Sequence, residues 1–220
     1  GEMEDQLIPF DANLAEFLNE SDMGEIASDL LASFEDDNES RDEWEETYTK
    51  GLDLLGVKTI ERSEPFQGAS GVTHPLIAES VTQFQAQAYK ELLPPQGPVK
   101  TQVVGEYNSA VEEQAQRVKE FMNYQITHVM EEYDEDLDQM LFYLPLAGSA
   151  FKKVYYDENL GRAVSKFVAP EDLIVPYYTT DLENCPRITH LIKMPENEVK
   201  KLQAIGFYRN VKVDTGDDET

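Results

Sequence analysis

The run Gly68-Ala69-Ser70-Gly71 comes nearest in this chain to a motif for nucleophilic or phosphate chemistry. A nucleophile elbow requires Gly-x-Ser-x-Gly, and here the second glycine follows the serine one position too early. A phosphate-binding loop requires a lysine directly after its last glycine, and Val72 occupies that position. The run is therefore interpreted as a flexible loop that leads into a helix.

Three alternating aspartates, Asp134, Asp136 and Asp138, begin like a calcium-binding loop. Such a loop needs glycine at position six and a bidentate glutamate at position twelve. Gln139 and Pro145 stand there instead. The aspartates are therefore interpreted as the charged start of a helix.

The remaining candidates for chemistry are three histidines and many carboxylates. His74, His128 and His190 have no second histidine or cysteine at metal-ligand spacing. With 44 acidic residues, pairs of carboxylates arise by chance, so they indicate no acid–base site. The sequence therefore predicts no catalytic residue, no metal and no cofactor. A hydrolase that uses such chance carboxylates is the enzymatic alternative.

The charge of the chain is strongly acidic and unevenly distributed. Its 44 acidic and 18 basic residues give a net charge of −26, and residues 1–65 hold 20 of the acidic but only 4 of the basic ones. Because this surface repels phosphate, tight nucleic-acid binding is not expected. A role in contact with DNA would have to be passive, as a surface along which DNA slides without being bound. The alternative is that the acidity merely keeps the protein in solution.

Two further features bear on the compartment. Cys185 is the single cysteine, so no internal disulfide can form and the chain fits a reducing compartment. No apolar run has the length of a membrane span, and the start shows no signal-peptide pattern. No membrane partner is therefore predicted.

Apolar residues at helical spacing predict most of the chain to be helical. Ser21 or Asp22 is expected to cap the first helix, and the acidic run Glu35–Glu39 to end it. Ser109 and Glu112 form a capping-box pattern. The predicted helices cover 21–34, 41–55, 75–92, 109–129, 135–143 (limited by Pro145) and 196–205.

Alternating or β-rich segments predict a few short strands. Phe151–Tyr156 and Ala163–Val168 flank a turn-rich connector and indicate a hairpin. The other predicted strands are Val99–Gly105, Leu173–Val175 and Arg187–Met194. The predicted class is therefore α+β, mostly helical, with a small and mainly antiparallel sheet in the C-terminal third.

Several blocks of the sequence resemble the podovirus-like portal (head-to-tail connector) proteins of tailed phages. The blocks are EPFQGASGVTHPLIAE at 64–79, the segment Gln83–Gly105 with its PVKTQVVG ending, and Leu141–Tyr208 with LPLAGSAFKKVYY at 144–156. The resemblance covers about residues 59–208, roughly two thirds of the chain, and rests on the length and order of the blocks.

The resemblance implies a structural subunit of a portal ring, usually of twelve copies, and not an enzyme. DNA passes through such a ring at one capsid vertex during packaging and ejection, without specific binding. The partners of such a ring are capsid or scaffold proteins, a separate terminase motor and tail adaptors. The ring is found in the virion, and in the host cytoplasm during assembly. Portals of this family are considerably longer than this chain, which is therefore expected to be a fragment.

With that resemblance, the chain is predicted to have four parts. Residues 1–20 are expected to form an acidic arm that becomes ordered only against a partner or against the rest of the chain. Residues 21–58 are expected to form an acidic helical hairpin, 59–208 a region like a portal wing, and 209–220 a polar tail or truncation point. The resemblance assigns no role to residues 1–65.

A ring closes only when one surface of a subunit meets a different surface of its neighbour. Trp44, Phe121 and Tyr124 are the candidate residues for that contact, although core packing is the favoured role of Trp44. The alternative function is a monomeric acidic adaptor or scaffolding-type module that binds other proteins.

Overall fold

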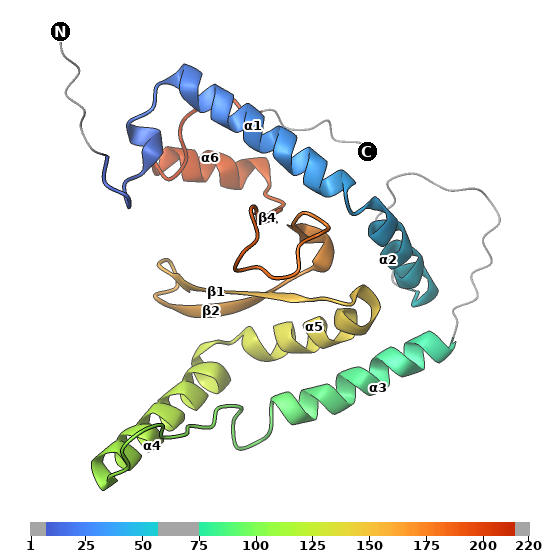
Figure 1. Ribbon diagram of the computed structural model, residues 1–220, viewed down its shortest axis with the longest axis vertical. Helices are drawn as coiled ribbons and strands as arrows, with labels where there is room; N and C mark the ends of the chain where they lie inside the picture. The colour runs from blue at the N-terminus through green and yellow to red at the C-terminus, as the bar shows by residue number, and fades with distance from the viewer. Residues whose placement is uncertain (1–7, 57–74, 214–220) are drawn as a thin grey trace. The chain divides into compact units, whose positions relative to one another are not determined.

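The computed structural model describes residues 8–56 and 75–213, and Figure 1 shows the order of its elements. The predicted α+β class is confirmed, because these residues are mostly helical and carry a small antiparallel sheet in the C-terminal third. The chain divides into two compact units, Gly1–Thr189 and His190–Thr220. The four-part division made from the sequence stays a prediction.

The first long helix, α1, spans Glu20–Glu39 and follows a short 3-10 turn, η1 (Leu14–Glu16). Its cap is Asn19, whose side-chain oxygen accepts a hydrogen bond from the N–H of Asp22 at 2.9 Å. The predicted caps, Ser21 and Asp22, are therefore wrong by two or three positions. Asn is as good a cap as Ser or Asp, so local preference alone could not decide between them.

The predicted end of this helix is also wrong, because α1 continues through the acidic run Glu35–Glu39. Asp37 is buried in the middle of that run, and its carboxylate is paired with Arg187. A carboxylate that is paired in this way no longer repels its acidic neighbours with its full charge. The ion pair with a residue distant in sequence thus offsets part of the repulsion within this run.

The second helix, α2, spans Asp42–Leu54, as predicted. Tyr48 and Leu52 are buried and form a core cluster with Ala147, and Trp44, Tyr143 and Leu146 pack against it. Trp44, Tyr48 and Leu52 recur every four positions on α2, which places them on one face of that helix. Gly56 follows the helix with φ +76°, the left-handed conformation expected of a terminal glycine.

Two helices of the first unit pack along each other, α3 (Pro75–Leu92) and α5 (Tyr133–Ala147) (Figure 1). α5 begins earlier and ends later than predicted and includes Pro145. A proline lacks an N–H and disturbs a helix interior, but here it lies in the last turn, where only Leu146 and Ala147 follow it in the helix. The N–H of Gly148 then closes the helix on the carbonyl of Leu144.

The apolar stripe predicted for α3 is only partly buried. Val81 is fully buried, and Ile77 and Ala88 are half-buried. Leu76, Phe84 and Leu92 are exposed, against the prediction. Within the described residues, α5 is thus too narrow a partner to cover the whole stripe.

The segment predicted as the strand Val99–Gly105 is an extended linker without strand pairing. The side chain of Asn123 replaces a neighbouring strand, because it accepts the N–H of Val99 at 2.8 Å and donates to its carbonyl at 3.1 Å. The linker then leads into α4 (Ser109–Tyr124). Its cap is Asn108, one residue before the predicted Ser109, and a π-helical turn, η2 (Gln125–Val129), follows it.

The predicted hairpin is confirmed. β1 (Phe151–Asp157) and β2 (Arg162–Val168) pair antiparallel, with Val154 opposite Ser165. The connecting turn is built by the side chain of Asp157, which accepts the N–H groups of Asn159 and Leu160. β2 lies against α5.

The remaining elements are short. The 3-10 turn η3 (Pro170–Asp172) precedes β3 (Leu173–Ile174), and β3 pairs with β4 (Thr189–His190). The strand predicted over Arg187–Met194 is therefore mostly wrong, because only two of its residues pair. α6 (Glu196–Ala204) in the second unit confirms the last predicted helix.

Candidate interaction surface

Of the three residues predicted to contact a neighbouring subunit, Trp44 lies in the core cluster on α2. Its ring stacks on Tyr48 with 5.1 Å between the ring centroids, and its indole N–H donates to the carbonyl of Ala147 at 3.1 Å. The apolar ring and the polar N–H of Trp44 thus both have partners within the chain.

Phe121 and Tyr124 lie on α4 and are 61% and 55% exposed. Val118 and Met122, on the same helix, are also exposed. Positions 118, 121 and 122 are neighbours on a helix surface, because residues three and four apart lie side by side. We call Val118, Phe121, Met122 and Tyr124 the α4 patch.

Among the described residues, the extended linker contacts α4 at Ala115 and Asn123. Thr101 donates its hydroxyl hydrogen to the carbonyl of Ala115, and Asn123 holds Val99 through the two bonds described above. Val111 and Ala115, on the same helical stripe as Val118 and Met122, are half-buried. Even so, none of the 16 residues of α4 is fully buried.

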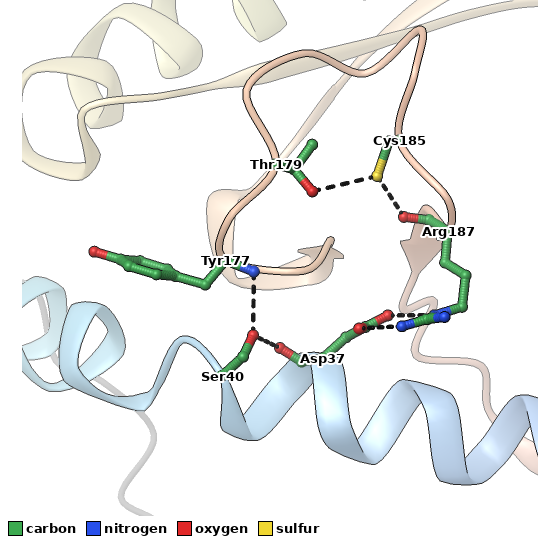
Figure 2. Close-up of polar contacts among 6 residues, drawn as sticks. All are labelled: Asp37, Ser40, Tyr177, Thr179, Cys185 and Arg187. Carbon is green, nitrogen blue, oxygen red and sulfur yellow. Dashed lines mark hydrogen bonds and ion pairs between the residues drawn. The ribbon is translucent and has the colours of Figure 1, made fainter.

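Buried charge in the first unit gathers where α1 ends, and Figure 2 shows the first part of it. Arg187 donates to both carboxylate oxygens of Asp37, from Nε at 2.8 Å and from Nη2 at 2.7 Å. The Asp37 side chain is 4% exposed and that of Arg187 is 39% exposed. The hydrogen bonds that Arg187 donates to the Asp37 carboxylate raise the pKa of Arg187.

The loop around this ion pair is held by further hydrogen bonds, also drawn in Figure 2. Ser40 donates its hydroxyl hydrogen to the carbonyl of Asp37 and accepts the N–H of Tyr177 at 3.2 Å. Cys185 donates to the carbonyl of Arg187 at 2.8 Å. The lone cysteine thus takes part in the structure of the loop.

Arg41, one helical turn beyond Asp37, is the second buried charge at this corner. It donates to three backbone carbonyls of the segment around η3, namely those of Pro170, Glu171 and Leu173, at 3.0, 2.6 and 3.2 Å. Burial lowers the pKa of Arg41, and the surrounding carboxylates oppose that shift. Neutral carbonyls thus replace water around a buried guanidinium.

Two carboxylates of the α5 start close the outer edge of β2. Glu132 accepts the N–H of Ser165 at 2.8 Å and Asp136 that of Phe167 at 2.7 Å, and Arg162 pairs with Glu132. Burial acts to raise the pKa of Glu132, but the backbone hydrogen bonds and Arg162 outweigh it, so the pKa is lowered. Asp136, a candidate from the calcium-like run, thus has a structural partner.

The other residues singled out by the sequence are not gathered into one site. Asp134 accepts a hydrogen bond from the hydroxyl of Tyr89, which raises the pKa of Tyr89 to about 12. His128 is exposed, stacks on Tyr124 and hydrogen-bonds Thr127. His190 is half-buried in the second unit. His74 and the run Gly68–Gly71 lie outside the described residues.

Within residues 8–56 and 75–213, no three His, Cys, Asp or Glu side chains come together in a way that could hold a metal ion. The helices in those same ranges include none long and apolar enough to cross a membrane.

Comparison with known proteins identifies no family for the chain. No protein-family model matches it, and no curated protein matches it either.

Proposed function

We propose that the chain is a structural subunit of a phage portal ring, which forms the channel at a capsid vertex for genome packaging and ejection. In this role it also serves as a platform for terminase and tail adaptors. The proposal rests on the sequence blocks at 64–79, 83–105 and 141–208.

One structural observation supports an assembly role, and it concerns α4. This helix carries apolar residues at helical spacing, yet its patch of Val118, Phe121, Met122 and Tyr124 is exposed. A contiguous apolar patch rimmed by polar residues is typical of a surface that another protein covers. Phe and Tyr are also among the residues enriched where proteins meet.

The charge of the chain is compatible with a channel that does not grip DNA. At a net charge of −26, phosphates are repelled and not neutralised, so translocating DNA would meet no strong binding step. Within residues 109–124 the charges nearly balance, with Glu112, Glu113 and Glu120 against Arg117 and Lys119. α4 is thus a place where two copies of an acidic subunit can approach without strong repulsion.

The direct test is to change Phe121 in the full-length protein. We expect Phe121→Asp to reduce the fraction of assembled rings by about tenfold or more, because a buried carboxylate without a partner is costly. The measurement is the distribution of particle masses by mass photometry.

The matched control is Gln116→Asp, which adds the same charge to an exposed position on the same helix. The two positions are five apart in the sequence, so their side chains point about 140° apart around the helix. Equal ring formation by both variants would remove the α4 patch from the interface. A full-length wild-type protein that remains a monomer would instead favour the acidic adaptor.

A further inference from the structure

The hairpin β1–β2 has two outer edges, and within residues 8–56 and 75–213 only the edge on β2 has hydrogen-bond partners, from α5 and the residue before it. The N–H groups of Ser165 and Phe167 on β2 point away from β1, because they donate to Glu132 and Asp136. These carboxylates block that edge against further strands. Proteins commonly protect edge strands in this way, because an open edge is a template for pairing.

The register of the hairpin determines which groups β1 presents at the opposite edge. Val154 lies opposite Ser165 and Lys152 opposite Phe167. When the N–H of one member of an antiparallel pair points outward, that of the other member does as well. The outward backbone groups of β1 are therefore those of Lys152, Val154 and, by alternation, Tyr156.

In the part of the chain that the structure describes, this edge of β1 is exposed from Val154 to Tyr156, whereas Lys152 is half-buried. Its outward N–H groups have no partner among the hydrogen bonds of the described residues. Val154 and Tyr156 are 68% and 63% exposed, which is unusual for apolar side chains on a strand next to a packed helix. The open edge is thus both a row of free backbone groups and an apolar surface.

We propose that β1 pairs antiparallel with β1 of a second copy of this chain, which joins two hairpins into one four-stranded sheet. A twofold axis through Val154 places Val154 opposite its own mate, Lys152 opposite Tyr156, and Lys153 opposite Tyr155. The outward groups then meet one another and form about six backbone hydrogen bonds. The axis is perpendicular to the sheet, so both copies of α5 stay on the same face.

The chemistry of the side chains that face each other across the two β1 strands also favours this pairing. Lys153 already lies over the ring of Tyr155 within its own chain, at 5.4 Å from the ring centroid. In the pair it faces a second Tyr155, and cations are attracted to such ring faces. Lys152 keeps its place over the ring of Tyr133 at 3.6 Å.

Charge also selects against another register. An axis through Lys153 would place two lysines directly opposite each other, which destabilises a strand pair.

The lysines also change the local charge of β1. Residues 151–157 hold Lys152 and Lys153 against Asp157, so this strand is locally basic in a chain of net charge −26. Two copies can therefore approach here with little repulsion.

The contact is separate from the proposed portal ring and does not depend on it. A ring needs two different surfaces on each subunit, whereas β1 uses the same surface on both copies. The free chain would form dimers and not larger closed assemblies through this edge.

The first test is Val154→Pro, measured by sedimentation of this 220-residue chain over a series of concentrations. Proline removes the outward N–H, and edge strands tolerate it at such a position because no bond within the hairpin is lost. We expect a reversible wild-type dimer and a dissociation constant about tenfold higher for the variant. A wild-type chain that stays monomeric at its highest attainable concentration would overturn the proposal, as would an unchanged dissociation constant in the variant.

The second test locates the axis by cross-linking and does not depend on how the proline variant folds. In a Cys185→Ser background, Val154→Cys places two thiols opposite each other at about 5.5 Å between Cα atoms, within the range for a disulfide. Lys166→Cys, exposed on β2 away from the open edge, is the control. We expect an oxidised dimer with Val154→Cys only. Equal cross-linking at both positions would contradict the pairing.

Discussion

At the scale of single residues, the fold of the first unit depends on charges that the chain buries with partners. Asp37 and Arg41 lie four residues apart at the end of α1. One reaches Arg187, and the other reaches the carbonyls around η3. The acidic N-terminal helices are therefore fastened to the segment 170–187 by specific polar contacts.

Asp37→Asn is expected to lower the free energy of unfolding by about 2 kcal/mol. Removing one member of a largely buried ion pair leaves the other uncompensated, although Arg187 is exposed enough to regain some water. Urea unfolding monitored by circular dichroism measures the change. Asp29→Asn, on the exposed part of α1, is the control and should change stability by less than about 0.5 kcal/mol. Equal losses in the two variants would show that the ion pair contributes little.

Glu132 is expected to make stability depend on pH. Its pKa is lowered in the folded chain from the ordinary 4.5, so its carboxylate stabilises the fold above that value. This contribution is lost as the pH falls through the lower, folded-state pKa. The stability difference between wild type and Glu132→Gln should therefore be constant near neutral pH and shrink below pH 4.5.

Urea unfolding of both proteins from about pH 3 to 7 measures this difference. Glu135→Gln, exposed in the first turn of α5 and three positions after Glu132, controls for the general effect of removing one negative charge. A difference that grew on acidification would contradict the assigned sign.

At the scale of the elements, the close approach of α2 and α5 is set by one glycine. A Cβ atom on Gly51 would lie 2.7 Å from Cδ1, 3.1 Å from Cγ and 3.3 Å from Cδ2 of Leu146. Leu146 in turn packs against the core cluster of Tyr48, Leu52 and Ala147. The whole leucine side chain would have to move to make room.

Gly51→Ala and Gly24→Ala should therefore change stability in opposite directions. Both glycines are inside helices, where alanine is favoured by about 1 kcal/mol. No atom lies within 4 Å of a Cβ on Gly24, so that variant should gain about this amount. At Gly51 the overpacking, about 1–3 kcal/mol, should exceed the gain. Thermal unfolding of both variants checks the signs, and stabilisation by both would mean that Leu146 moves freely.

The positions of most elements could be predicted from the sequence, because their signals are local. α2, the hairpin and α6 carry apolar periodicity and turn residues within their own segments. Asp37, in the acidic run through which α1 continues, is paired with Arg187, 150 residues away, and Val99 is hydrogen-bonded by Asn123, 24 residues away. Rules that consider only neighbouring residues in the sequence cannot predict contacts with such distant partners.

The candidate surface was predictable to a smaller extent. Phe121 and Tyr124 could be named from the sequence, but the open edge of β1 could not. It is recognised only once Glu132 and Asp136 are seen to occupy the opposite edge of the hairpin. Such an edge has no signature in composition, because its residues are those of any strand.

At the scale of the whole molecule, an acidic chain exposes apolar surface on several elements. The exposed residues include Leu30 and Leu31 on α1, Phe121 on α4, and Val154 on β1. Scattered exposed apolar residues are normal, but on α4 and β1 they are contiguous. A net charge of −26 opposes association elsewhere on the surface. Together these features favour an assembly with a few defined contacts over an isolated monomer.

The proposed portal subunit is tested most directly by the particle mass and symmetry of the full-length protein. Mass photometry combined with class averages from electron microscopy gives both. We predict closed rings of roughly twelve copies with a central channel, held by heterologous contacts. A full-length protein that is monomeric at every concentration, or that forms only dimers with twofold symmetry, would contradict the account.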